Sequence, residues 1–516
     1  MPTSGCDVAV VGAGPAGAAA AVTAVRAGAR VVLVDCEARP GGQYWRHGPG
    51  TGATGVAGGE VHEHAAQWRD LAGRLDRALA SGRLAHLPRT RVWRLDPPTA
   101  HGGEAGQAPV RLHAVSADAD RGDQPVVVEA AAVVLAPGAH DRVLPFPGWD
   151  LPGVLTAGGA QALLKEHGVA AGARAVVAGT GPFLLPVAVA LAEAGVRVLE
   201  VDEASDARGW ARGWRAAAGA PGKVADGARY AALLARHRVP VHLRQAIVAA
   251  HGSDRLEAVT VARLDPEWNV IAGTERRLEC DTAAVGWGFV ARLELALQAG
   301  CGTVPGPDGT PAVAVDTSGR TTVPGVLAAG ELTGVGGADL ALLRGALAGT
   351  AAAAVAAGRE PPPAHPAITS RRARLEAFAS AMHGAHPVRN GWTGWLVDDT
   401  VVCRCEEVPA RAFDEAVTEL GASDARTVKL LTRAGMGWCQ GRMCGEAVAR
   451  LTAARAGTHL DPYADLLAVA ARPVAVPVPL GVLAQDHAQD HAQDHAHDPD
   501  HTHPHDHDHH SLGGTA

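Results

Sequence analysis

The chain has 516 residues, 47% hydrophobic and 19% charged, which is the composition of a globular protein of about three domains. Its net charge of −8 argues against a nucleic-acid partner, because surfaces that bind nucleic acid are basic. Eight cysteines are too sparse for a disulfide scaffold, no apolar stretch is long enough to cross a bilayer, and the N-terminal residues lack a secretory signal. We therefore expect a cytoplasmic protein without a transmembrane segment.

The first segment predicts a dinucleotide-binding βαβ unit. Residues 6–17 read as a buried strand and a glycine-rich turn, a small-residue helix follows, and a second strand ends at Asp35. Gly12 permits the tight turn, Gly14 lets a pyrophosphate approach the backbone, and Gly17 lets the helix pack on the strand. The pyrophosphate is expected at the helix N-terminus and a ribose hydroxyl at Asp35. The candidate contacts are Gly12, Gly14, Pro15, Ala16, Gly17 and Asp35.

The rest of the pattern alternates strands and helices, which predicts an α/β class with parallel sheets. The expected elements are a helix at 61–79, a strand at 90–95, a polar meander at 97–125, a buried strand at 126–137, a second βαβ signature from 173, a strand at 322–330 and a helix at 338–356. The proline-rich stretch 360–366 is expected to be a stiff linker.

Three further motifs resemble those of the two-dinucleotide-binding flavoprotein superfamily, in which they enclose FAD. They are Pro40-Gly41-Gly42-Gln43, Ala136-Pro137-Gly138 and Ala329-Gly330-Glu331. Two of them depart from the superfamily pattern, because Glu331 stands where Asp is usual and Ala136 begins a triplet that is usually Ala-Thr-Gly. The resemblance implies a Rossmann-like FAD domain with an inserted NAD-type domain. It also implies further FAD contacts at Gly42, Gln43, Val92, Gly138, Gly330, Glu331 and Ala338.

A second glycine turn makes NAD(P) binding doubtful. Its pattern is Gly179, Gly181 and then Leu184, where a third glycine is usual. A leucine there is expected to push the helix off the strand or to crowd the pyrophosphate, although Glu200 or Asp202 could still meet a ribose. A retained scaffold domain and a site for another nucleotide stay open. Within 141–280 the only cysteine is Cys280, so a flavin-linked disulfide reductase lacks its second thiol.

Four cysteines predict a metal centre near the C-terminus. Cys403 and Cys405 form a C-x-C pair, and after 33 intervening residues Cys439 and Cys444 form a C-x4-C pair. Four thiolates can hold a [2Fe–2S] cluster or a tetrahedral zinc ion. The spacing differs from the C-x2-C of common zinc modules and resembles the [2Fe–2S] domain of the bacterioferritin-associated ferredoxin type. Helices are expected at 409–420 and 427–434, and glycines at 437, 441 and 445 are expected to bring N–H groups close to sulfur.

A flavin domain followed by this cluster domain resembles one family, the larger flavoprotein subunits of bacterial amine dehydrogenases. Its members include the corresponding subunits of hydrogen cyanide synthase, opine oxidase and hydroxyproline dehydrogenase. Supporting stretches lie at 138–149, 151–158 and 333–340. The resemblance implies an electron-transfer subunit that works with an FAD-containing catalytic subunit of the glycine/sarcosine-oxidase type. A small ferredoxin-like subunit is a second candidate partner. No acid, base or nucleophile for substrate chemistry stands out in this chain.

Two other functions stay open at this point. One is a stand-alone NAD(P)H-dependent flavin reductase, and the other is a zinc-bearing scaffold that retains FAD structurally. The expected division is 1–140 and 281–360 for the FAD domain, 141–280 for the inserted domain, 361–395 for a linker, 396–460 for the small helical cluster domain and 461–516 for a disordered tail. The ten histidines of this tail, interleaved with Asp, suit Zn²⁺ or Ni²⁺, or serve only as a solvated tail.

Overall fold

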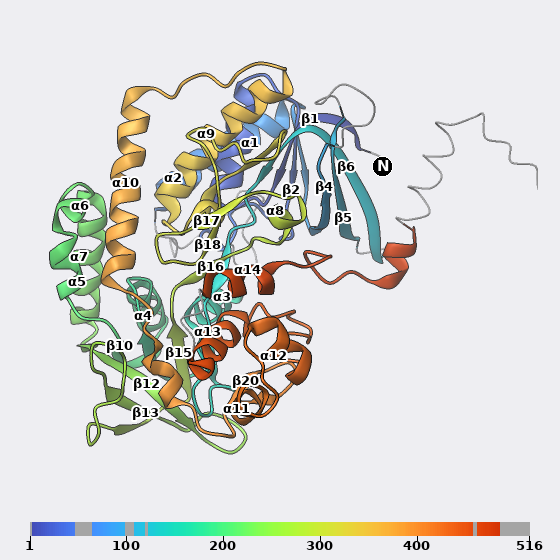
Figure 1. Ribbon diagram of the computed structural model, residues 1–516. Helices are drawn as coiled ribbons and strands as arrows, with labels where there is room; N and C mark the ends of the chain where they lie inside the picture. The colour runs from blue at the N-terminus through green and yellow to red at the C-terminus, as the bar shows by residue number, and fades with distance from the viewer. Residues whose placement is uncertain (1–2, 47–63, 99–107, 119–121, 458–461, 486–516) are drawn as a thin grey trace, which may run out of the picture.

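The computed structural model describes residues 3–46, 64–98, 108–118, 122–457 and 462–485 (Figure 1). Its first layer is a sheet in the order β3-β2-β1-β6-β5-β4, with β19 beside β6. The strands are β1 (Thr3–Val11), β2 (Val31–Val34), β3 (Leu84–Leu87), β4 (Thr90–Asp96), β5 (Val110–Asp118), β6 (Gly122–Leu135) and β19 (Val326–Ala328). β1, β2, β3, β6 and β19 are parallel and the β4–β5–β6 meander is antiparallel, as the sequence predicts.

Helices cover one face of this sheet with small residues. They are α1 (Pro15–Arg26), α2 (Ala65–Ala80) and α9 (Ala338–Ala356), and they form one hydrophobic core with the inward side chains of β1, β2 and β6. α9 is long and apolar enough to cross a membrane, but it packs closely on α1. A Cβ on Gly345 would lie 2.1 Å from the Ala16 carbonyl oxygen, and one on Gly349 equally close to that of Ala20. The two helices can therefore touch only because these positions are glycine.

The inserted domain carries its own parallel sheet, in the order β11-β10-β9-β15-β8. Its strands are β8 (Val154–Thr156), β9 (Arg174–Gly179), β10 (Arg197–Glu203), β11 (Val241–Leu243) and β15 (Thr282–Gly286). The helices α3 (Ala157–His167), α4 (Leu184–Glu193) and α7 (Pro221–Arg236) pack on one face. The antiparallel sheet of β12 (Gln245–His251), β13 (Ala258–Arg263) and β14 (Arg276–Glu279) packs on the other.

The expected boundary at residue 280 is wrong, because β15 lies between β9 and β8 in the inserted sheet. The domain therefore extends through Gly286. It joins the FAD domain through a short antiparallel ribbon of β7 (Ala139–Asp141) and β16 (Phe289–Ala291). Beyond the ribbon lie α8 (Glu294–Gln298) and the hairpin of β17 (Thr303–Pro305) and β18 (Pro311–Val313).

The expected linker at 361–395 is largely a helix, α10 (Pro366–Ala385), followed by the 3₁₀ turn η2 (Asn390–Trp395). Pro366 occupies its first turn, where a missing N–H costs nothing. The helix packs on the short helices α5 (Arg208–Arg212) and α6 (Trp214–Ala218), and a Cβ on Gly209 would lie 2.4 Å from the Ala385 Cα. Its polar residues run all round it, so it shows no apolar stripe in the sequence.

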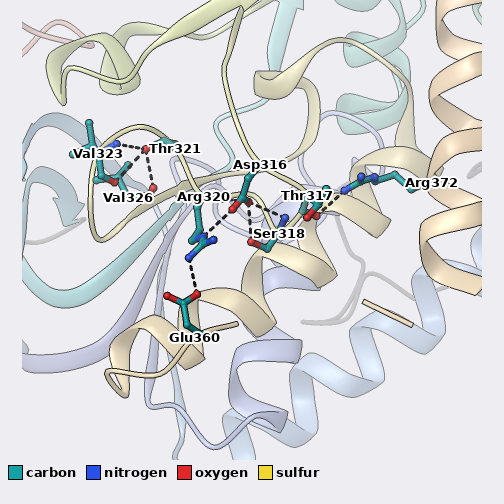
Figure 2. Close-up of polar contacts among 9 residues, drawn as sticks. All are labelled: Asp316, Thr317, Ser318, Arg320, Thr321, Val323, Val326, Glu360 and Arg372. Atoms are coloured by element: carbon teal, nitrogen blue, oxygen red, sulfur yellow. Dashed lines mark hydrogen bonds and ion pairs between the residues drawn. The ribbon is translucent and has the colours of Figure 1, made fainter. Parts of the chain in front are cut away.

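Polar contacts tie this helix to the FAD domain (Figure 2). Arg372 on α10 donates to the Thr317 carbonyl oxygen. The adjacent turn is closed by Asp316, which accepts from the backbone N–H groups of Ser318 and Arg320 and from the Arg320 guanidinium. Arg320 also pairs with Glu360, just after α9. The chain is thereby held to the FAD domain on both sides of the proline-rich stretch.

The cluster domain begins with a two-stranded ribbon, β20 (Val401–Cys403) and β21 (Val408–Pro409), followed by helices. These are α11 (Ala410–Thr418), α12 (Ala425–Thr432), α13 (Gly445–Ala456) and α14 (Pro462–Ala470). The expectation that disorder starts at 461 is wrong for 462–485. α14 packs on the cluster domain, and the following strap (471–485) returns to the FAD domain, where Val482 is buried with Trp93 and Val115. The histidine-rich stretch from 486 lies outside the described residues.

Candidate cofactor sites

The first glycine turn has the geometry of a dinucleotide site. Gly12 has a φ of +97°, and a Cβ there would lie 2.3 Å from the Ala136 carbonyl oxygen. A Cβ on Gly17 would lie 1.7 Å from the Gly12 carbonyl oxygen, so both positions require glycine. At Gly14, the N-cap of α1, a Cβ would meet nothing closer than 3.9 Å. The space above Gly14 at the helix N-terminus is therefore free to take a phosphate group.

Asp35 directly follows β2, and its side chain faces the turn. Its carboxylate accepts hydrogen bonds from the backbone N–H groups of Ala13 (3.0 Å) and Glu37 (3.1 Å). Burial raises the pKa of Asp35 to about 6. The Thr90 N–H donates to the Asp35 carbonyl oxygen at 2.8 Å, which brings β4 and its buried Val92 next to the acidic end of β2. The structure thus gives Asp35 a role in holding the turn, and its contact with a ribose stays a prediction.

The loop after Asp35 closes over the turn. The Gly41 N–H donates to the Ala13 carbonyl oxygen (2.8 Å), and a Cβ on Gly42 would lie 2.7 Å from the Gly14 Cα. The Gln43 side chain accepts from the Arg46 guanidinium, which also pairs with Glu166 on α3. The Pro-Gly-Gly loop therefore lies directly against the phosphate-binding turn.

The Ala329-Gly330-Glu331 motif, far along the chain, contacts the same glycine turn. A Cβ on Gly330 would lie 2.7 Å from the Ala16 Cβ, so the start of η1 (Gly330–Thr333) touches the start of α1. The Glu331 carboxylate accepts from the N–H groups of Gly336 (2.7 Å) and Gly337 (2.9 Å), and burial raises its pKa. It closes the turn that leads to Ala338, the first residue of α9. The longer Glu side chain binds this backbone turn, and its contact with a ribityl hydroxyl stays a prediction.

These motifs converge on one cradle, which fits FAD. The structure brings together Gly12, Gly14, Pro15, Ala16, Gly17, Gly42 and Gly330, with Ala136 beneath the turn and Gly138 in a left-handed conformation two residues further. Two helices, α1 and α9, begin beside it, and their unpaired N–H groups favour phosphate and other negative charge.

The inserted domain has a similar turn with a different acid. The Glu203 carboxylate accepts from the Gly181 N–H (2.8 Å) and the Thr180 hydroxyl (2.7 Å), as Asp35 accepts from Ala13. Sequence reasoning missed Glu203, although it ends its strand as Asp35 does. The favoured candidates, Glu200 and Asp202, instead share the Gln245 side chain. Burial and the neighbouring Glu200 raise the pKa of Asp202 to about 8, so it is a buried core carboxyl group.

The acid of this second turn also contacts another part of the chain, while the space at Gly181 stays open, since a Cβ there would meet nothing within 4 Å. His386, which follows α10, lies 3.3 Å from the Glu203 carboxylate and accepts from the Trp210 indole N–H at 3.0 Å. Leu184 does not push α4 away as expected, because its side chain is buried in the domain core beside Gly286. A Cβ on Gly286 would lie 3.2 Å from the Leu184 side chain, so glycine at 286 makes the room. The acid that would meet a ribose is therefore already paired.

The four expected cysteine ligands come together as two pairs. Cys403 and Cys444 are in hydrogen-bond contact, which lowers the pKa of Cys403 to about 5 and raises that of Cys444. Cys405 and Cys439 form the second pair. In the described ranges, no three His, Cys, Asp or Glu side chains are grouped around one point as a single metal ion needs. Two thiol pairs match the two irons of a [2Fe–2S] cluster, each held by two thiolates.

The glycines around the cysteines act differently from the expectation. One N–H that approaches sulfur belongs to Gly435, at 3.4 Å from the Cys403 Sγ. Gly437 allows close packing, because a Cβ there would lie 2.3 Å from the Cys405 Cβ. Gly445 makes room for Val469 of α14. The remaining cysteines belong to the FAD domain and the inserted domain: Cys6, Cys36, Cys280 and Cys301.

A buried ion-pair network fixes the cluster domain to the flavin body. Arg142, next to β7 and only 5% exposed, pairs with Asp308 of the FAD domain (2.6 Å) and with Glu446 of α13 (2.7 Å). Beside it, Glu294 pairs with Arg442 (2.9 Å) and Arg472 (3.1 Å). Arg142, Glu446, Glu294, Arg442 and Arg472 line a cavity of about 50 Å³ between the domains. The ion pairs across it join the flavin body and the cluster domain into one packed unit.

Family models match most of the chain. The model described as "Pyridine nucleotide-disulphide oxidoreductase" matches residues 6–360, and the one described as "BFD-like [2Fe-2S] binding domain" matches residues 401–454. Together they cover the FAD cradle, the inserted domain and all four paired cysteines. They confirm the expected fold class, with FAD and a [2Fe–2S] cluster as cofactors.

Curated proteins with similar sequences are subunits of heteromeric enzymes. "Hydrogen cyanide synthase subunit HcnB" of Pseudomonas aeruginosa is 34% identical over 84% of this chain and 90% of its own length. An opine oxidase subunit of Agrobacterium tumefaciens is 32% identical over 87% of this chain and 86% of its own length. Among solved structures, L-proline dehydrogenase from P. horikoshii superimposes with a TM-score of 0.61 at 20% identity, over 93% of this chain and 79% of that chain. This last likeness shows a shared fold.

Proposed function

Because the chain belongs to the pyridine nucleotide-disulphide oxidoreductase family and carries a BFD-like [2Fe–2S] domain, we propose that it is the electron-transfer subunit of a heteromeric amine dehydrogenase. Its donors are CH–NH or CH–NH₂ compounds of the opine, glycine or hydroxyproline kind. The proposed partner is an FAD-containing catalytic subunit of the glycine/sarcosine-oxidase type, which oxidises the C–N bond. We also propose that the complex is cytoplasmic.

The observation that carries this proposal is the packing of two cofactor sites into one unit. When bound, FAD accepts two electrons together and a [2Fe–2S] cluster accepts one, so the pair links two-electron to one-electron transfer. Gly12, Gly14 and Gly17 shape the FAD pyrophosphate site, and the four paired cysteines hold the cluster. Arg142 fixes one site against the other through carboxylates from both domains.

Two observations weigh against the alternatives. A stand-alone NAD(P)H-dependent reductase needs a free ribose-binding acid, and Glu203 is paired with His386. A zinc-bearing scaffold does not account for the match of residues 401–454 to the BFD-like [2Fe–2S] binding domain. The names of the similar subunits, which concern cyanide synthesis, opines and sarcosine, favour amine or amino-acid donors.

The test replaces one cluster ligand and one matched cysteine. Cys405→Ser is expected to lose or strongly perturb the iron and sulfide content and the cluster absorbance, while Cys280→Ser leaves them intact. Both variants are expected to keep FAD, because neither cysteine lies in the FAD cradle. In the presence of the catalytic subunit, amine-dependent reduction of a one-electron acceptor should fall severely only in Cys405→Ser. One zinc and no iron in anaerobically prepared protein would overturn the proposal, as would undiminished turnover of Cys405→Ser.

A further inference from the structure

Large apolar side chains are exposed beside the cluster ligands. Trp438, which precedes the ligand Cys439, is 83% exposed, and Leu430 near the end of α12 is 66% exposed. Leu431 and Met436 between them are also exposed. We call these four residues, Leu430, Leu431, Met436 and Trp438, the apolar patch. Groups of exposed large apolar side chains mark interaction sites on soluble proteins.

The backbone places the patch around an exposed ligand. Gly437 packs directly on Cys405, since a Cβ there would lie 2.3 Å from the Cys405 Cβ. Met436 and Trp438, its chain neighbours, therefore flank the exposed Cys405. The Met436 N–H donates to the Arg433 carbonyl oxygen at 3.0 Å, which turns the chain from the end of α12 towards the ligand. A protein that covered the patch would thus lie over one side of the cluster site.

The charges carried by the segment of the patch itself are positive. Residues 425–445 contain Arg426, Lys429, Arg433 and Arg442 and no Asp or Glu, although the whole chain carries a net −8. Arg433 is paired with Glu406 at 2.9 Å and Arg442 with Glu294 at 2.9 Å, Asp424 caps α12, and Glu407 is exposed. The basic rim of the patch therefore consists of Arg426 and Lys429 on α12. An apolar centre of Trp, Met and Leu with an Arg/Lys rim has the composition of a protein interface, and its charge attracts an acidic partner.

We propose that the apolar patch and its basic rim are the docking surface for an acidic one-electron carrier protein. This inference rests on the proposed function, because it names the class of partner that meets the cluster site. When the two proteins meet, one electron passes from the reduced protein to the oxidised carrier. The protein is oxidised and the carrier reduced by one electron, and no bond is made or broken and no proton is transferred. Short-lived redox encounters bury small surfaces, below about 1,200 Å².

The test measures binding of an acidic plant-type [2Fe–2S] ferredoxin by calorimetry at low and high salt. Trp438→Ala and the double variant Arg426→Glu/Lys429→Glu are each expected to weaken binding at least tenfold. The double variant should also reduce the dependence on salt. The matched controls are Trp214→Ala, a tryptophan 60% exposed on α6, and Arg371→Glu, an exposed charge on α10. Both controls should bind within twofold of the unaltered protein, and basic cytochrome c should bind none of these proteins.

Several outcomes would overturn the docking surface while leaving the proposed function intact. They are an iron-loaded protein that binds no ferredoxin, control variants that weaken binding as much, and equal binding of cytochrome c. If Trp438→Ala converts a dimer to a monomer, a second copy covers the patch instead. If it releases the co-purified catalytic subunit, that subunit covers it. Absence of iron from the unaltered protein would refute both the docking surface and the proposed function.

Discussion

Replacing Arg142 with Met removes the central charge of the interface between the flavin body and the cluster domain. Arg142 is buried and holds Asp308 at 2.6 Å and Glu446 at 2.7 Å. Burial alone would raise the pKa of Asp308, but the charge of Arg142 and the Thr310 hydroxyl hold that pKa below its usual range. Methionine has a similar length and no charge, so the variant leaves a buried carboxylate without its counter-ion.

The two carboxylates are not affected equally. Glu446 keeps a second partner, Arg450, at 2.8 Å, whereas Asp308 keeps only its bonds from Thr310. Removing one member of a buried ion pair costs about 3–5 kcal/mol. Because Glu446 stays paired, we expect the lower end, about 3 kcal/mol. A free-energy change of about 1.4 kcal/mol is a factor of ten in an equilibrium constant. The equilibrium constant for packing the cluster domain on the flavin body should therefore fall by roughly 100-fold.

The assay follows urea unfolding of the cluster domain by cluster absorbance and of the flavin body by FAD release. In Arg142→Met, cluster absorbance should be lost at a lower urea concentration than FAD. The matched control, Arg411→Met, removes an exposed pair with Asp399 and should change stability by no more than about 0.5 kcal/mol. The double variant Arg142→Met/Asp308→Asn should recover most of the loss, because no unpaired charge remains. Arg142→Met with the stability of Arg411→Met would refute this reasoning, as would a double variant that recovers nothing.

Three further predictions concern the other sites. Gly14→Val should fold but purify without FAD, because the valine side chain fills only the pyrophosphate space. Gly222→Val on α7 is the control and should keep FAD. A full FAD-to-protein ratio in Gly14→Val would contradict the assignment of the site. Neither NADH nor NADPH should rapidly bleach the flavin under anaerobic conditions, because His386 is paired with Glu203; fast stoichiometric bleaching would remove this argument. Asp316→Asn should lower the free energy of unfolding by about 1 kcal/mol at pH 7, because it weakens the hydrogen bonds from the Ser318 and Arg320 N–H groups. The loss is small because the carboxylate is partly exposed to solvent. Although burial opposes it, hydrogen bonds from Arg320 and Ser318 lower the pKa of Asp316 to about 2, so its contribution is complete above the unfolded value of 3.8 and disappears as the pH falls towards 2. Thermal denaturation between pH 3 and 7 should show the gap between the two proteins closing below pH 4, and a constant gap would contradict this origin.

The sequence could predict those parts of the fold in which the local backbone geometry of a position permits only one residue type. Gly12 and Gly17 have no space for a Cβ, so their spacing identifies the turn. Cysteine spacing identifies the cluster domain for a similar reason, because thiolates have few other uses in such pairs. Leu184 breaks the second pattern without moving the helix, and only the structure shows that Gly286 opposite it supplies the room.

The parts that were missed depend on contacts between distant segments. α10 is polar all round and is held by its neighbours, so its sequence resembles that of a linker. His386 and Glu203 are in contact, but more than half of the inserted domain and the whole second part of the FAD domain lie between them in the sequence. No local sequence pattern predicts such a pair. The strap after α14 alternates valine with proline, and its order comes from covering Trp93. In each case tertiary packing overrides local propensity.

The returning strap gives the cluster domain two attachments to the same body. The chain enters this domain from α10 and η2, and it leaves through residues that pair with β4, where the Ala475 N–H donates to the Trp93 carbonyl oxygen at 2.8 Å. A module joined by a single hinge can shuttle between a charging and a discharging position, but one that is anchored at entry and exit cannot. The spacing between the two redox centres is therefore set once, when the chain folds.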